Sequence, residues 1–185
     1  MSTQPLEAAI ASTRGVLAGV SSGQLGGATP CASWTVAELI NHIVGGQHFF
    51  RAGVLGEPPS DGGDFAIGDF LAAFDEAAAA CVAAFQADGV MEKTITLPFG
   101  QMPGAAFVGI AATDTFTHGW DLARATAQPT DLAPDLAAGL LAGAQQFIQP
   151  AFRGAEGQSP FGPELPAPEG ASNADRLAAF LGRTV

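Results

Sequence analysis

Basic residues are scarce in this sequence, and tyrosine is absent altogether. Seven Lys and Arg residues stand against eighteen Asp and Glu residues, which gives a formal net charge of -11. The seven bases are spread along the chain, whereas phosphate backbones and anionic lipid surfaces are bound by clustered Lys and Arg. The sequence therefore predicts no nucleic-acid partner and no membrane partner.

Long hydrophobic runs are also missing, and cysteine is rare. No apolar run reaches the roughly 18 residues of a membrane span, and the N-terminal stretch has no charged region followed by an apolar one, as a signal peptide would. Two cysteines, Cys31 and Cys81, are too few for a disulfide framework. These absences favour a reduced, cytoplasmic protein, and they leave both a monomer and a homodimer open.

Apolar residues make up 48% of the 185 residues, which is ample material for the core of one domain. Alanine is frequent and favours helix, because it loses little side-chain entropy there. Apolar positions recur with a period near 3.6 in five long segments. We expect helices over residues 4–20, 35–55, 65–87, 105–127 and from Pro134 to just before Pro150. The fold class is therefore all-α, a helical bundle.

Local signals mark several element ends. Thr35 and Glu38 form a capping box at the start of the second helix, and Gly89 is a plausible C-cap of the third. Residues 94–103 combine a β-prone stretch with Pro and Gly, so we expect a short β excursion there.

The C-terminal part differs in composition from the rest. Residues 150–170 hold five prolines and four glycines, which favours an extended segment. Ser172 and Asp175 resemble an N-cap pair of a short terminal helix that ends at Gly182. We therefore predict a helical bundle over residues 1–150 and a tail over residues 151–185 that packs on the same domain.

Chemistry-bearing side chains gather on the fourth predicted helix. Asp114, His118 and Asp121 fall within about 60 degrees of arc on a stripe that is otherwise apolar. Buried polar groups are costly unless they are paired or bound to a metal, and a carboxylate and a His at i, i+4 can both reach one ion. The alternative is a hydrogen bond that holds the imidazole, or a solvated face.

A second histidine strengthens the metal interpretation. His42 lies in the middle of the second helix, and Gly45 and Gly46 leave room on the next turn. It could instead be a core histidine satisfied by a carbonyl or by Glu38, although Glu38 is better explained by the capping box. His48 points elsewhere, and we expect it at the surface or behind the ligands.

Three stretches of the chain resemble a known family. The run TPCASWTVAELINHIVGG resembles the first motif of the DinB-like metal-binding bundle superfamily, in the branch that includes mycothiol-dependent maleylpyruvate isomerase. The run DTFTHGWDLARATAQ resembles its second motif, and the ending from FGPELPAP to ADRLAAFLGR resembles the tail of small actinobacterial members. The resemblance covers nearly the whole chain.

The resemblance implies a four-helix bundle that holds a divalent metal, usually zinc or nickel. One ligand is a His of the second helix, and two come from a Glu-x-x-x-His pair of a later helix. In this sequence the corresponding residues are His42, Asp114 and His118. Three protein ligands leave coordination positions open, as catalytic sites do. The implied function is a thiol-dependent transferase or isomerase that acts on a small electrophile, with mycothiol as the cosubstrate.

Two departures limit what can be carried over. Asp114 replaces the family's Glu, and its reach is roughly 1.3–1.5 Å shorter. Either the helices approach more closely, or a water bridges the gap, or the ion is lost; we expect a site that binds metal more weakly. The isomerase also has an additional C-terminal domain, so maleylpyruvate isomerisation is not transferred. The alternative function is a non-catalytic binding or stress-associated protein with a vestigial metal site.

Five further residues have two interpretations each. Trp34 and Trp120 are expected as core anchors, although either could line a pocket. Asp121 could be a third carboxylate at the metal, or it could orient a ligand. Cys31 could be reactive, although a small apolar filler is favoured. Arg124 could meet a substrate carboxylate, although pairing at the surface is commoner.

Overall fold

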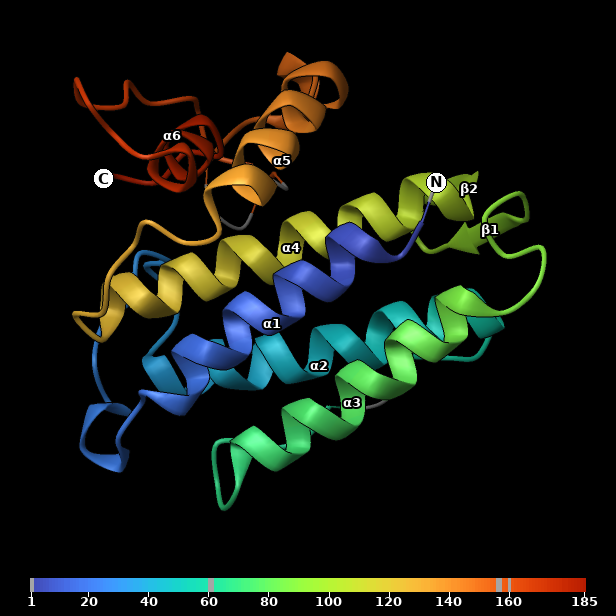
Figure 1. Cartoon of the computed structure of the whole chain (residues 1–185), viewed down its shortest axis with the longest axis horizontal. Helices are drawn as coiled ribbons and strands as arrows, with labels where there is room; N and C mark the ends of the chain where they lie inside the picture. The colour runs from blue at the N-terminus through green and yellow to red at the C-terminus, as the bar shows by residue number, and fades with distance from the viewer. Residues whose placement is uncertain (1, 60–61, 156–157, 160) are drawn as a thin grey trace.

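The fold is known from a computed structural model, which describes residues 2–59, 62–155, 158–159 and 161–185 (Figure 1). Parts of the loop expected after the second helix and of the Pro/Gly-rich tail lie outside these residues. The elements, in chain order, are α1 (Gln4–Ala18), a 3-10 turn (Ser22–Gln24), α2 (Val36–Leu55), α3 (Phe70–Gln86), β1 (Thr94–Leu97), β2 (Gly100–Pro103), α4 (Gly104–Ala125), α5 (Pro134–Phe147), a 3-10 turn (Pro150–Phe152) and α6 (Asn173–Phe180). The predicted all-α fold with a short β excursion is confirmed.

The first four helices form a bundle (Figure 1). Going around the bundle, α1 contacts α4, α4 contacts α2, α2 contacts α3, and α3 contacts α1 again. Gln128, just after α4, donates to the carbonyl of Val16 near the end of α1, so these two helices run parallel. Gln86 at the end of α3 donates to Thr3 at the start of α1, so α3 runs the opposite way. Helices that follow each other in sequence, α1 with α2 and α3 with α4, therefore lie diagonally opposite in the bundle. The β1–β2 hairpin is part of the connection from α3 to α4.

Capping chemistry decides where the helices begin. The capping box of α2 is confirmed, because the Thr35 amide donates to the Glu38 carboxylate at 2.7 Å and the Glu38 amide donates back to the Thr35 hydroxyl. The start of α3 was predicted five residues too early. Asp69 caps this helix by accepting from the Ala72 amide at 2.9 Å, which places the first helical residue at Phe70.

The predicted C-cap of α3 is wrong. The helix ends at Gln86 with Ala87 as its C-cap, and Gly89 lies beyond it in a turn with φ of 75°. The extended residue Ala87 already ends the helix, so the glycine serves the turn that leads to β1. β1 and β2 then pair antiparallel, with Thr94 opposite Pro103 and Leu97 opposite Gly100.

Close contact between α1 and α4 depends on a small residue beside the candidate site. A Cβ at Gly119 would lie within 2.3 Å of the Thr13 hydroxyl oxygen, so glycine is required there. The Thr13 hydroxyl donates to the Thr115 carbonyl at 2.8 Å. This approach presses α1 against the helix that carries His118.

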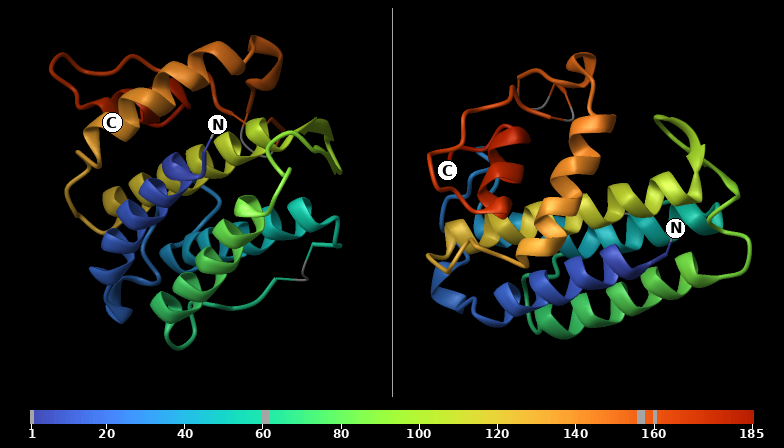
Figure 2. Two further views of the ribbon diagram at one scale, coloured as in Figure 1. Left: turned by 45° about the vertical axis from the view of Figure 1, so that its right-hand side comes forward. Right: turned by 45° about the horizontal axis from the view of Figure 1, so that its top comes forward.

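The C-terminal elements cover the bundle on the side of α4 that faces away from α3 (Figure 2). α5 and α6 pack on each other, and Leu177 of α6 joins the same buried hydrophobic cluster as Trp120 of α4. The Trp120 indole N–H donates to Asp175 at 2.9 Å. The described residues of the range 134–183 therefore form a cap that we call the C-terminal cap.

None of the helices in the described part of the chain is both long enough and apolar enough to cross a membrane.

Candidate metal site

The structure brings the three predicted ligands together between α2 and α4. Nε2 of His42 lies 3.7 Å from Oδ1 of Asp114, and Nε2 of His118 lies 3.6 Å from the same oxygen. The two imidazole ring centroids are 4.4 Å apart. One potential ligand atom from each residue falls within 4.8 Å of the others. We call these three residues the open cluster.

This geometry fits a divalent metal. In a tetrahedral zinc site with bonds of about 2.0–2.1 Å, donor atoms lie about 3.4 Å apart, close to the two distances measured to Asp114. Nε2 of His42 is buried and has no hydrogen-bond partner among the described residues. Such an atom is costly unless something binds it. Two imidazoles and one carboxylate are donors that zinc and nickel accept.

A second group, which we call the closed cluster, lies on the other side of His118. Nδ1 of His118 is 3.0 Å from Oδ2 of Asp121, which is fully buried. The Cys31 thiol donates to the same oxygen at 3.3 Å. Arg183 from the C-terminal cap donates to both Asp121 oxygens, at 3.2 and 3.0 Å. Cys31, His118 and Asp121 could also approach one ion, but the Arg183 guanidinium already neutralises their carboxylate.

The charges explain how these groups titrate. Burial lowers the pKa of His118, but the Asp114 charge and the hydrogen bond to Asp121 outweigh it and raise that pKa to about 10. Burial raises the pKa of Asp121, yet the hydrogen bond from His118 and the charge of Arg183 bring it down to about 2. The pKa of Asp114 is lowered in the same way, with burial opposed by the charge of His118 and by His42. A metal bound to the open cluster must therefore displace a proton from His118.

Aromatic residues border the open cluster. The Trp34 ring lies 4.5 Å from the His42 ring and 5.7 Å from the His118 ring, so this tryptophan lines the site. Trp120 is buried, as its role as a core anchor requires. His48 stacks on Phe65 at 5.6 Å, away from the ligands. Arg124 is exposed.

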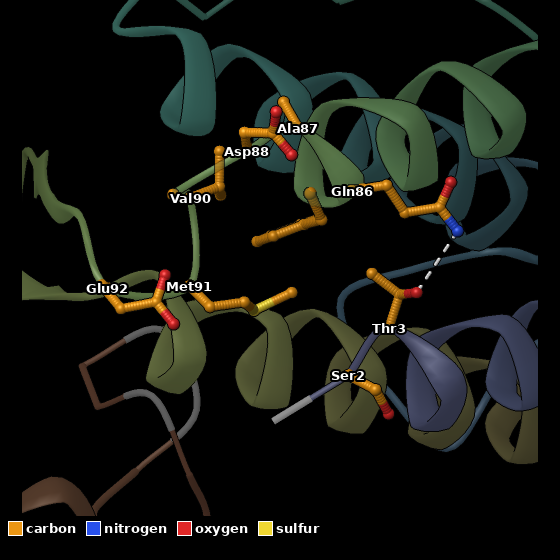
Figure 3. Close-up of a pocket in the computed structure, with 10 residues that line it drawn as sticks. Ser2, Thr3, Gln86, Ala87, Asp88, Val90, Met91 and Glu92 are labelled. Carbon is orange, nitrogen blue, oxygen red and sulfur yellow. Dashed lines mark hydrogen bonds between the residues drawn. The ribbon is translucent and has the colours of Figure 1, made fainter.

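A pocket of about 440 Å³ opens beside the open cluster, and His42 and Asp114 form part of its wall. Another pocket, of about 280 Å³, lies where the start of α1 meets the segment after α3 (Figure 3). Thr3, Gln86 and Met91 line this second pocket, and none of its described lining residues belongs to either cluster. The first pocket is therefore the one relevant to chemistry at the open cluster.

Comparison with known proteins identifies the family of this chain. A family model described as the mycothiol maleylpyruvate isomerase N-terminal domain matches residues 6–123. The chain belongs to this family. The match runs from the first turn of α1 to the last turn of α4 and includes all three residues of the open cluster, whereas the C-terminal cap lies after it.

Relatives of this family member occur in mycobacteria. Two uncharacterized proteins of Mycobacterium tuberculosis, from the CDC 1551 / Oshkosh and H37Rv strains, are each 46% identical to this chain over 174 residues. Each alignment covers 92% of this chain and 91% of the relative. No solved structure gives a significant match.

Sequence reasoning missed Arg183. It lies 62 residues after Asp121, and no local pattern links the two. The only available signal was the scarcity of bases, because seven Lys and Arg residues among eighteen Asp and Glu residues are each expected to pair with a carboxylate. The contact between Cys31 and Asp121 was also missed, although both residues lie in the two motifs that resemble the family.

Proposed function

We propose that this protein holds a divalent metal ion, zinc or nickel, through His42, Asp114 and His118, and that it catalyses a thiol-dependent transfer or isomerisation on a small electrophile. The single observation that carries the proposal is the unpartnered, buried Nε2 of His42, which faces a second imidazole and a carboxylate. Three protein donors leave a coordination position open.

When bound, the ion supplies a Lewis acid that lowers the pKa of a thiol. Nδ1–H of neutral His118 donates a hydrogen bond to Asp121, which keeps the Nε2 lone pair directed to the open cluster. Arg183 and Cys31 hold Asp121 in turn. In a transfer, the S–H bond breaks, a bond forms between sulfur and a carbon of the electrophile, and the electron pair displaced within the electrophile takes up the proton. In an isomerisation, that carbon–sulfur bond then breaks again, its electron pair leaves with sulfur, the carbon–carbon double bond re-forms as the adduct loses the proton, and the thiol regains it.

The family suggests the identity of the thiol. Mycothiol appears in the description of the matching family model, so we propose mycothiol as the cosubstrate. We also propose a cytoplasmic location, where both cysteines, Cys31 and Cys81, would stay reduced.

The test is metal content followed by turnover. We expect purified, untagged protein to hold about one zinc or nickel ion per chain, and to consume mycothiol when a suitable electrophile is added. His42→Ala should lose both properties. His48→Ala is the matched control, because His48 lies on the same helix but stacks on Phe65, and it should keep both.

A second candidate is a non-catalytic binding protein without metal. The observation that favours it is the charge balance at the site, because a protonated His118 lies between Asp114 and Asp121 and satisfies both. In that case the parent protein and His42→Ala would be equally free of metal, even after dialysis against zinc or nickel.

A further inference from the structure

The pocket beside the open cluster is built mainly from one face of α2. Its lining residues there follow a helical spacing of three, four, seven and eight residues from His42. α4 supplies the opposite wall, and the turn between β1 and β2 supplies a phenyl ring. The lining residues are His42, Gly45, Gly46, Phe49, Phe50, Phe99, Ile110 and Asp114. The volume of about 440 Å³ falls within the range of small-molecule sites.

Aromatic rings form most of the wall. Phe99 is 64% exposed at the tip of the hairpin, and its ring stacks on Phe49 with centroids 6.4 Å apart. Phe49 also contacts Phe50 edge-on at 5.6 Å. An exposed phenyl ring at the mouth of a pocket is unfavourable in water, so it is well placed to contact a ligand.

Two glycines keep the pocket open. A Cβ added at Gly45 would meet no atom within 4 Å, so the space next to it is free. At Gly46, a Cβ would lie 3.5 Å from Asp114 and 3.8 Å from Phe50. A side chain at either position would occupy the volume between the phenyl rings and the open cluster.

The charged groups that line the pocket limit the kind of ligand that it can bind. Asp114 brings a carboxylate to one end, and none of the described lining residues is Lys or Arg. Arg183 is held by Asp121 and by the Leu181 carbonyl. An ion at the open cluster could meet one carboxylate of a dicarboxylate, but the second carboxylate would lie among the aromatic walls, where no described lining residue is a cation, and this is costly.

We propose that this pocket binds the uncharged aromatic part of the substrate, so that the electrophile is a small neutral aromatic compound and not a dicarboxylate of the maleylpyruvate type. This inference rests on the proposed function for the reaction, but the binding itself needs only the walls of the pocket. One edge of the bound ring lies next to His42 and Asp114, and the rest packs on Phe49 and Phe99.

The test uses N-phenyl-1-naphthylamine, a neutral aromatic compound that fluoresces when it leaves water. We expect saturable binding to the full chain, both as purified and after chelator treatment. Gly45→Leu should weaken the binding at least tenfold by filling the pocket. Gly143→Leu is the matched control, because Gly143 is also inside a helix with open space at its Cβ, and it should bind as the parent does.

Two further measurements keep the test decisive. Phe99→Ser should weaken binding about fivefold, and because Phe99 is 64% exposed we expect this variant to fold as the parent does. 2-Naphthol should displace the probe, whereas maleate at the same concentration should not. Absence of saturable binding, equal binding by Gly45→Leu, or displacement by maleate would each overturn the inference.

Failure of the pocket and failure of the metal site are distinguishable. If the protein holds no metal but binds the probe in a way that Gly45→Leu abolishes, the proposed function falls and the aromatic pocket stands. If the protein holds metal and consumes mycothiol but does not bind the probe, the pocket assignment falls and the function stands.

Discussion

The open and closed clusters share His118, yet they differ in charge and in access to solvent. On the open side, the Asp114 carboxylate is 29% exposed and faces two imidazoles and a pocket. On the closed side, the Asp121 carboxylate is fully buried and already has Arg183 as a counter-ion. A cation added to the closed cluster would meet a guanidinium, whereas a cation added to the open cluster would meet an available carboxylate. Carboxylates on the two sides of the His118 imidazole thus favour different roles. Asp114 is suited to bind a metal ion, and Asp121 is suited to orient the His118 ring.

Removing one donor from the open cluster should have the largest effect. Asp114→Ala should weaken zinc binding at least about a hundredfold, since each of a few ligands carries about 3 kcal/mol of the total. Cys31→Ala, the matched change in the closed cluster, should leave the affinity within about threefold because Cys31 is not a ligand. Zinc titration with a competing chelator measures both. A larger loss in Cys31→Ala would place the ion on the wrong side of His118.

Changes to the residues that orient His118 should have an intermediate effect. Asp121→Asn and Arg183→Met should each weaken zinc binding by about 10–100-fold, as loss of a hydrogen-bond partner behind a metal-bound histidine does. Arg183→Lys keeps the charge and should recover part of the loss. The absorption spectrum of the cobalt-substituted protein reports the coordination directly. Unchanged affinity and an unchanged spectrum in Arg183→Met would reduce Arg183 to a structural contact of the C-terminal cap.

Lengthening the carboxylate arm should have a smaller effect. The sequence alone predicts a weaker site with Asp114 and a gain from Asp114→Glu. The structure argues for the reverse, because Oδ1 already lies 3.6–3.7 Å from both Nε2 atoms and Gly46 allows the close approach. We now expect Asp114→Glu to weaken zinc binding about tenfold, because metal bonds tolerate only a few tenths of an ångström. Stronger binding by Asp114→Glu would restore the original prediction.

The smallest expected effect concerns the two thiols. Cys81 is fully buried, and burial raises its pKa to about 12, whereas Cys31 is partly exposed. Iodoacetamide at pH 8 should therefore label one cysteine in the native protein and two in denaturant, as mass spectrometry would show. Native Cys31→Ala should take up no label. Zinc should change the rate of labelling less than about threefold, since the ion lies on the other side of His118; full protection by zinc would make Cys31 a ligand.

Local sequence patterns were sufficient to predict the helices and to single out His42, Asp114 and His118, whereas the resemblance to the family joined these three into one ligand set. His42, Asp114 and His118 each lie on the inward stripe of a long amphipathic helix, and helical periodicity fixes that stripe. The capping box at Thr35 was equally local. The start of α3 was not predicted correctly. The apolar pattern begins at Phe65, whereas the helix begins only after its N-cap, Asp69.

Contacts between distant segments were beyond the sequence argument. Arg183 reaches Asp121 only because the C-terminal cap packs on α4, and Phe99 reaches Phe49 only because the hairpin bends over the end of α2. Trp34 was expected in the core, or lining a pocket as its alternative, and the loop before α2 places it over His42. Each of these positions depends on tertiary packing, which periodicity does not encode.

The packing of α1 on α4 has a consequence for the order in which the helices dock during folding. Thr13 and Thr115 are 102 residues apart, and Gln128 and Val16 are 112 residues apart. Closing such long loops costs chain entropy before the contacts stabilise the fold, so we expect helix pairs with this sequence separation to form late. We therefore expect the first helix of the chain to be the last of the four to dock, with its apolar face in water until α2, α3 and α4 have assembled.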